Sequence, residues 1–203
     1  MRKRLASVLV TGIATAALAF ASAPAQADDT WTVTGSPGTL TATAGVTTLK
    51  DGNVTLTCQS ATAGGTIANG SGQAGAGIAS ITSAAFNTCS GPAGLTFTVQ
   101  PGLPWSLNAV SYDGSDVVTG TITNVSAHLQ GPACTADVTG SVAGTYTNST
   151  AVLKVDPALN GAQGTQLTVS NVVNCLGLMH NGDHPTFSAS YQVSPATIHI
   201  TSP

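Results

Sequence analysis

The densest group of side chains that could bind a metal ion lies at residues 180–184. His180, Asp183 and His184 offer two imidazoles and a carboxylate, which are common ligands of transition metals. Asn181-Gly182 between them is typical of a tight turn rather than a helix, so the two histidines need not point the same way. We therefore expect a hydrophilic hairpin loop here, with metal binding by His180, Asp183 and His184 as the alternative.

A second acidic group comprises Asp113 and Asp116 in a short Asp-Gly-Ser-Asp segment. Two carboxylates in one loop raise the possibility of a calcium site, but the EF-hand loop ends in a glutamate, and this chain contains no glutamate. The segment is better explained as a hairpin turn that joins strands at residues 107–112 and 117–125.

Signals for catalysis are weak. The G-x-S-x-G motif of many hydrolases is absent, and a glycosidase would need two aspartates brought together by the fold. His128 and His199 lie within strand patterns, where we expect surface or hydrogen-bonded residues. We predict no catalytic residues, no metal and no cofactor, and we keep a hydrolase that depends on Asp and His as the less favoured alternative.

Four cysteines occur in the chain, and an even number in an exported protein predicts two disulfides. Their positions are Cys58, Cys89, Cys134 and Cys175, and these spacings are too wide for a zinc site built from close pairs. Three connectivities are possible for four cysteines. We favour Cys58–Cys89 and Cys134–Cys175, because sequential pairs close the shorter loops.

Aromatic rings could form a platform for sugars. The tryptophans and tyrosines are Trp31, Trp105, Tyr112, Tyr146 and Tyr191. Because only eight aromatic residues follow residue 27, we expect these rings to belong mainly to the core.

Apolar and hydroxyl residues alternate with a period of two at residues 54–58, 95–99, 187–193 and 198–200. This alternation is typical of antiparallel strands with one buried and one solvated face. We predict an all-β fold with about a dozen strands, an antiparallel β-sandwich of the immunoglobulin-like or Greek-key type. Residues 60–77 are rich in Gly, Ala and Ser, and we expect a long surface loop there.

The N-terminus has the pattern of a secretory signal peptide: residues 2–4 are basic, residues 5–23 are apolar, and Ala25 and Ala27 fit the cleavage rule. We predict a signal peptide at residues 1–27 and a single β-sandwich domain at residues 28–203. An uncleaved membrane anchor is the alternative. After cleavage we expect a secreted, extracellular protein with no membrane attachment.

The charge of the predicted mature chain excludes some partners. Lys50 and Lys154 are its only basic residues apart from histidine, and two lysines against eight aspartates give a formal net charge of −6. Nucleic-acid binding requires a basic surface, so we expect no nucleic-acid partner. An anionic membrane surface is disfavoured for the same reason.

The Ala-rich signal, the Thr/Gly/Ala-rich mature chain and the ending Tyr-Gln-Val-Ser-Pro at residues 191–195 resemble small secreted actinobacterial β-rich proteins of uncharacterised function. The chain is also similar in character to the chromoprotein carriers related to neocarzinostatin. That resemblance implies a secreted acidic protein with two disulfides and an immunoglobulin-like sandwich, although the carriers' disulfides close shorter loops.

These observations favour a non-catalytic secreted protein that acts by binding, or by assembly at the cell surface, with an unknown protein or glycan partner. A small-ligand carrier or a carbohydrate-binding module is the alternative. A closed apolar cavity would favour the carrier, and coplanar exposed rings would favour sugar binding. Asp and His side chains within about 4 Å of each other would favour the hydrolase.

Overall fold

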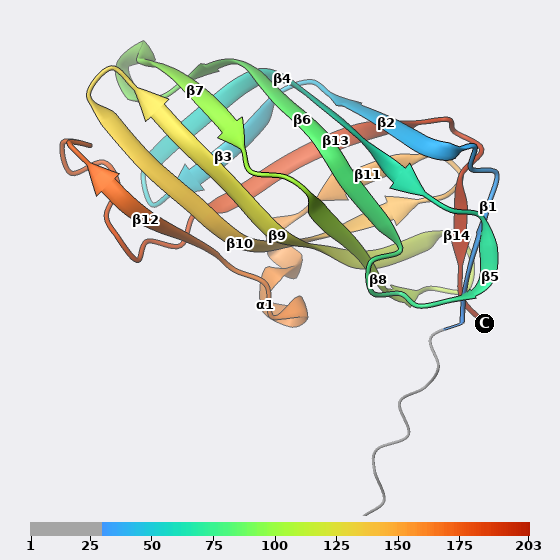
Figure 1. Cartoon of the computed structure of the whole chain (residues 1–203). Coiled ribbons are helices and arrows are strands. Elements are labelled where there is room, and N and C mark those ends of the chain that lie inside the picture. The colour runs from blue at the N-terminus through green and yellow to red at the C-terminus, as the bar shows by residue number, and fades with distance from the viewer. Residues whose placement is uncertain (1–29) are drawn as a thin grey trace, which may run out of the picture.

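The computed structural model describes residues 30–203 (Figure 1). The predicted signal peptide at residues 1–27 and its cleavage site lie outside the described residues. The strands of the described part are β1 (Trp31–Thr34), β2 (Gly38–Ala44), β3 (Thr47–Asp51), β4 (Val54–Ile67), β5 (Gly70–Gln73), β6 (Ala79–Ser90), β7 (Thr96–Pro101), β8 (Trp105–Tyr112), β9 (Val117–Gly131), β10 (Cys134–Thr147), β11 (Val152–Val155), β12 (Leu167–Val173), β13 (Thr186–Ser194) and β14 (His199–Thr201).

Helical structure is limited to three short segments, η1 (Pro92–Gly94), η2 (Pro157–Leu159) and α1 (Asn160–Gln163). Within residues 30–203, no helix is long and apolar enough to cross a bilayer.

Antiparallel pairing joins most of the strands into one sheet that closes on itself. Its neighbours run β9, β7, β6, β4, β2, β13, β11 and β10, and β10 pairs again with β9. In Figure 1, β9 and β10 cross the front of the molecule while β3 and β13 pass behind them. The sandwich-like layers are therefore continuous with each other and enclose a common interior.

Long strands organise this sheet, because each of three long strands is flanked on one side by two short ones. β4 pairs with β3 and β2, β9 pairs with β8 and β7, and β10 pairs with β12 and β11. Each long strand is thus paired along most of its length, first with one short strand and then with the other. The sheet therefore stays hydrogen-bonded where the chain leaves one short strand and enters the next.

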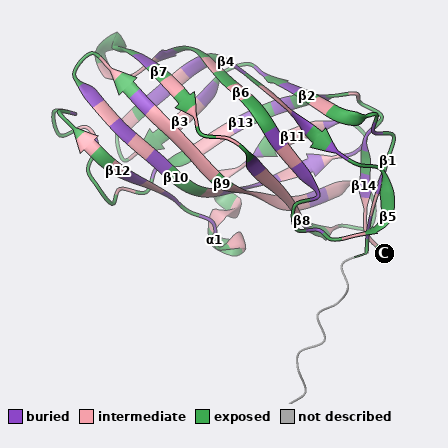
Figure 2. Cartoon of the chain, in the orientation of Figure 1, coloured by how far each residue is buried: buried purple, intermediate pink, exposed green. Residues whose placement is uncertain are grey.

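Buried and exposed residues alternate along the strands (Figure 2). Ala189, Tyr191 and Val193 of β13 are buried, whereas Ser190 and Gln192 between them are exposed. This pattern places Thr and Ser on the solvent face and the branched or aromatic side chains inside. The predicted all-β, antiparallel sandwich fold with two disulfides is confirmed.

A smaller three-stranded sheet, in the order β14, β1, β5, lies at one end of the molecule (right in Figure 1). Trp31 and Val33 of β1 are almost fully buried, as are Ile198 and Ile200 around β14. This sheet therefore covers that end of the interior with large apolar side chains.

Both disulfides have the predicted pairing. Cys58 of β4 faces Cys89 of β6 directly across the ladder and is bonded to it. Cys134 at the start of β10 is bonded to Cys175, which follows β12. Two disulfides indicate that the protein matures in an oxidising environment.

The expectation of a long surface loop at residues 60–77 is wrong. β4 continues to Ile67, and β5 occupies Gly70–Gln73. Gly65 is needed because a Cβ there would lie 2.1 Å from the carbonyl oxygen of Ser80 on β6. The small residues of this segment permit the close approach of two backbones. Loops are rich in the same small residues, so composition alone does not distinguish such a strand from a loop.

Candidate ligand-binding cavity

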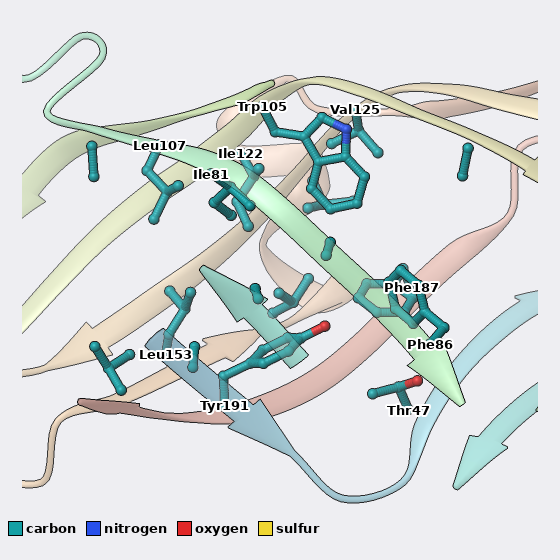
Figure 3. Close-up of a pocket in the computed structure, with 18 of the residues that line it drawn as sticks. Thr47, Ile81, Phe86, Trp105, Leu107, Ile122, Val125, Leu153, Phe187 and Tyr191 are labelled. Carbon is teal, nitrogen blue, oxygen red and sulfur yellow. The ribbon is translucent and has the colours of Figure 1, made fainter. Parts of the chain in front are cut away.

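An apolar cavity of about 150 Å³ lies inside the closed sheet (Figure 3). Aliphatic and aromatic side chains from nearly every strand of the sheet line it, and none of the described residues that line it is charged. An engineered cavity of about this volume, lined by Leu, Ile and Phe, stays dry and binds benzene. The interior can therefore hold a small apolar molecule.

A row of alanines explains why space remains here. In the register of the sheet, Ala42 of β2 lies beside Ala63 of β4, and Ala63 lies beside Ala84 of β6. All three line the cavity. Three neighbouring strands thus present methyl groups where longer side chains would reach the opposite wall, so the layers leave a void instead of interdigitating.

Aromatic rings contribute part of the cavity lining. The rings of Phe86 on β6 and Phe187 on β13 meet edge to face, with centroids 6.0 Å apart and planes at 86°. Trp105 of β8 also lines the cavity, and its indole N–H donates to the carbonyl oxygen of Gly102 at 2.9 Å. Its polar atom is therefore satisfied outside the cavity, and only the apolar ring surface faces inward (Figure 3).

Three hydroxyl-bearing residues line the same space: Thr47, Tyr146 and Tyr191. The hydroxyl of Tyr146 donates to the carbonyl oxygen of Ile198 at 2.8 Å. Burial raises the pKa of both tyrosines to about 12. Thr47 is 1% exposed, and its Oγ1 has no hydrogen-bond partner among the described residues.

One stretch of the cavity wall is not closed by backbone pairing. β6 pairs with β8 at residues 79–81 and with β7 at residues 89–90, and residues 82–88 have no strand partner on that side within the described chain. Phe86 lies within this stretch, and Val99 of β7 and Trp105 of β8 line the cavity from the strands next to it. This stretch of the wall is therefore held by side-chain packing and not by ladder hydrogen bonds on that side.

The predicted aromatic residues lie mostly inside. Trp31, Trp105, Tyr146 and Tyr191 are buried, and Tyr112 is half-buried. The expectation that these rings belong mainly to the core is confirmed, and an exposed platform of these rings for sugars is not formed.

The predicted cluster at residues 180–184 forms a loop in which the two histidines diverge. Nδ1 of His180 lies 3.4 Å from Oδ2 of Asp183, whereas Nδ1 of His184 lies 3.0 Å from the carbonyl oxygen of Leu167 on β12. The backbone N–H of His180 also donates to Oδ2 of Asp183 at 2.6 Å. Within residues 30–203, no group of three or more His, Cys, Asp or Glu residues is arranged to hold a metal ion.

Asp51, at the end of β3, approaches this loop. Partial burial, followed by the hydrogen-bonded contact with Asp183, raises the pKa of Asp51. The backbone N–H of His180 lowers the pKa of Asp183. The contact places the end of β3 against the loop at residues 180–184.

Asp113 and Asp116 form the predicted hairpin turn between β8 and β9. Oδ1 of Asp113 accepts hydrogen bonds from the backbone N–H groups of Ser115, Asp116 and Val117 at 2.8–3.0 Å. These bonds lower the pKa of Asp113 to about 2. Oδ1 of Asp116 accepts from the backbone N–H of Ser149 at 2.7 Å. Both carboxylates are occupied in holding turns.

A His–Asp pair that sequence reasoning missed lies on the outer face of the sheet. His128 of β9 and Asp137 of β10 face each other across the ladder, with Nδ1 and Oδ1 2.6 Å apart. The side-chain amide of Asn171 donates to Asp137 at 2.7 Å, and this bond, followed by the contact with His128, lowers the pKa of Asp137. No sequence signal marks this pair, because only the register of three strands brings the residues together.

The distance within this pair meets the condition for a hydrolase, but its location does not. His128 is 43% exposed on an open sheet face, and neither residue lines the cavity. Active sites are usually concave and exclude water from the reacting groups. The pair is therefore well placed to stabilise the β9–β10 ladder and poorly placed to bind a substrate.

The sequence model of one protein family, described as "Alkane oxidation protein activator PraA/PraB-like", matches residues 1–197. The chain belongs to this family. No curated protein and no solved structure matches the chain. The PraA/PraB-like match spans the strands that carry the alanine row and the residues Thr47 and Tyr191.

Proposed function

We propose that this PraA/PraB-like protein is a secreted, non-catalytic carrier that binds a small apolar molecule inside its closed sheet. The observation that carries the proposal is the cavity of about 150 Å³ lined by uncharged, almost wholly apolar side chains. Transfer of an apolar molecule from water into such a space is favourable, and the lining has few polar groups that a hydrocarbon would leave unsatisfied.

The family description supports the apolar nature of the ligand. It names the activation of alkane oxidation, and an alkane has no polar group. A protein that holds such a molecule in water would help its supply to an oxidising system without performing the chemistry itself. This role requires no catalytic residue, metal or cofactor.

Secretion and the absence of nucleic-acid partners form part of the proposal. The signal-peptide pattern at residues 1–27 and the two disulfides support an extracellular protein, and the net charge of the predicted mature chain disfavours nucleic acid. A protein or glycan partner at the cell surface, and an actinobacterial source, stay predictions from the sequence.

Assembly through strand edges is less well supported than carriage, because two outer edges of the sheets are covered. The edge of β12 donates and accepts hydrogen bonds with the loop at residues 181–183, through Val169 and Val172. The edge of β14 is covered by the side-chain amide of Asn148, which accepts from the N–H of Ile200 at 2.8 Å and donates to its carbonyl oxygen at 2.9 Å. Covered edges oppose the addition of further strands.

The test is thermal unfolding of the mature, disulfide-bonded protein with benzene or hexane as the probe. A ligand that binds only the folded state stabilises it by about 1.4 kcal/mol at ten times its Kd. For a domain of this size, the melting temperature should rise by about 3–5 °C.

Adjacent alanines provide the matched control. Ala84 lines the cavity, whereas Ala85 on the same strand is exposed to solvent. Ala84→Leu should abolish the rise in melting temperature, and Ala85→Leu should preserve it. If neither probe raises the melting temperature of the wild-type protein, or if Ala84→Leu leaves the rise intact, the carrier proposal is wrong.

A further inference from the structure

A smaller hollow of about 50 Å³ lies next to the main cavity, on the side of β8, β9 and β10. Leu107, Ile122 and Leu153 are among the residues that line both spaces, so their side chains lie where the two meet. These side chains are only partly buried, as expected of groups that border empty space. In Figure 3 they lie on the opposite side of the main cavity from Phe86 and Phe187. The interior is thus elongated, with an aromatic end and an aliphatic end.

Two glycines explain why space remains in the smaller hollow. In the register of the sheet, Ala109 of β8 lies beside Gly120 of β9, and Gly120 lies beside Gly144 of β10. All three line the smaller hollow. A Cβ on Gly120 would lie 2.4 Å from the carbonyl oxygen of Asn108, and a Cβ on Gly144 would lie 2.2 Å from that of Lys154. Close backbone contact therefore excludes side chains at both glycines, and this row contributes only the Ala109 methyl group to the interior.

The smaller hollow offers a ligand no unpaired buried polar side chain. Asn108 borders it, and the side-chain oxygen of Asn108 accepts from the backbone N–H of Gly77 at 2.8 Å. The amide of Asn108 donates to the hydroxyls of Thr121 and Thr123, each at 3.1 Å. Within residues 30–203, neither buried side-chain polar atom that lacks a partner belongs to a residue of this hollow. A polar ligand group would lose its hydrogen bonds to water here, whereas a saturated chain would not.

The sizes of the two spaces limit the shape of a ligand. A cavity of about 150 Å³ holds benzene, which corresponds to about 25 Å³ per carbon atom. On this scale the main cavity has room for about six carbons and the smaller hollow for about two more. A compact molecule with eight carbons exceeds the main cavity, whereas a narrow chain can extend between Leu107 and Leu153 into the smaller hollow. Core side chains change rotamer, so this extension requires no movement of the backbone.

We propose that the interior selects unbranched alkyl chains of about eight carbons, with one end beside Phe86 and Phe187 and the other end in the smaller hollow beside Ala109. This inference rests on the proposed carrier function and specifies its ligand class: a linear saturated chain rather than a ring or a branched hydrocarbon. Each methylene group that moves from water into an apolar space lowers the Kd about fourfold. Two further carbons in the smaller hollow should therefore tighten binding about fifteenfold relative to hexane.

The test compares hexane, n-octane and iso-octane, which has the carbons of octane in a compact, branched form. Headspace gas chromatography over solutions of the mature, disulfide-bonded protein measures the Kd of each hydrocarbon. Ala109→Val places two further carbons in the smaller hollow, where Ala109 lies outside the lining of the main cavity. Ala85→Val adds the same groups on the exposed face of β6 and serves as the matched control.

Wild-type protein and Ala85→Val should bind octane about fifteenfold more tightly than hexane, and about tenfold or more tightly than iso-octane. Ala109→Val should abolish the preference for octane over hexane, because its side chain occupies the space of the two terminal carbons. If the wild-type protein binds hexane but prefers octane neither to hexane nor to iso-octane, or if Ala109→Val retains the preference, the linear-chain inference is overturned while the carrier function stands. If no hydrocarbon binds the wild-type protein, the carrier function itself fails, and the inference fails with it.

Discussion

The polar turns and the cavity use hydrogen-bonding groups in opposite ways. In the turn after β8, Asp113 accepts three backbone N–H groups from residues two to four positions further along the chain. In the cavity, Thr47 finds no partner within the described residues, although the chain is rich in hydroxyls. In the turn, the polar side chain is hydrogen-bonded to nearby backbone N–H groups. In the cavity wall, the hydroxyl without a partner belongs to an isolated threonine at the start of a strand.

This contrast explains why the polar clusters that stand out in the sequence, at residues 113–116 and 180–184, hold turns and loops in place. Asn, Asp and Ser at turns compete for nearby N–H groups, so their proximity in sequence already accounts for their hydrogen bonds. A ligand site inside a sheet is assembled across strands, and its members are separated by tens of residues. Pairs of variants, one at the cavity and one elsewhere in the molecule, test whether the cavity behaves differently from the rest of the fold.

The largest expected effect comes from the disulfides, of which one borders the cavity and the other does not. Cys58 lines the cavity, whereas Cys134–Cys175 holds the segment after β12 to β10. Replacing both cysteines of either pair by alanine should lower the free energy of unfolding by about 3–4 kcal/mol in the chain-entropy model. Melting temperatures should fall by on the order of 10 °C in each case.

Ligand binding should distinguish the two pairs. Loss of Cys58–Cys89 loosens β6 beside its unpaired stretch, so benzene or hexane should bind more weakly. Loss of Cys134–Cys175 should leave the affinity unchanged at a temperature where both variants are folded. Equal loss of affinity in the two double variants would show that the cavity depends on global stability rather than on its own wall.

Packing density provides the next comparison. Ala63 lines the cavity, and Ala136 is fully buried in the core but does not line it. Ala63→Leu should fill the void and raise the free energy of unfolding by about 1 kcal/mol. Ala136→Leu should overpack a dense region and lower the free energy of unfolding by about 1–3 kcal/mol. Chemical denaturation measures both values, and destabilisation of similar size in the two variants would indicate that the cavity is absent in solution.

Removal of the unpaired hydroxyl should have a smaller effect of the opposite sign. Thr47→Val without ligand should raise the free energy of unfolding by about 1 kcal/mol, because the buried hydroxyl is replaced by a methyl group of similar size. Thr62→Val on the exposed face of β4 serves as the control and should change stability by less than about 0.5 kcal/mol. A loss of stability in Thr47→Val would mean that the hydroxyl is hydrogen-bonded in the free protein.

Much of the fold is predictable from local patterns in the sequence. Alternation at residues 54–58 and 187–193 indicates the strands β4 and β13. Loop length favours, among three possible connectivities, the disulfide pairing that the structure has. The cavity is not predictable in this way, because Ala42, Ala63 and Ala84 become neighbours only through the register of three strands. The glycines of β4 are also misleading, because a glycine-rich sequence is typical of a loop. Their role in close backbone contact becomes visible only when β4 is paired with β6.

The smallest expected effect is the pH dependence of stability that arises from the Asp113 turn, where the carboxylate is fully hydrogen-bonded. Backbone N–H groups lower the pKa of the Asp113 carboxyl from 3.8 to about 2 in the folded protein. Its contribution to stability is therefore fully present above the unfolded pKa of about 3.9 and is lost as the pH falls toward about 2. Asp113→Asn keeps an acceptor oxygen but removes the titration, so its melting temperature should fall less than that of the wild type between pH 5 and pH 2.

Asp137, Asp156 and Asp183 also have lowered pKa values, so the acid dependence should become shallower without vanishing. Identical pH profiles of the two proteins would show that the turn is not held by the ionised carboxylate.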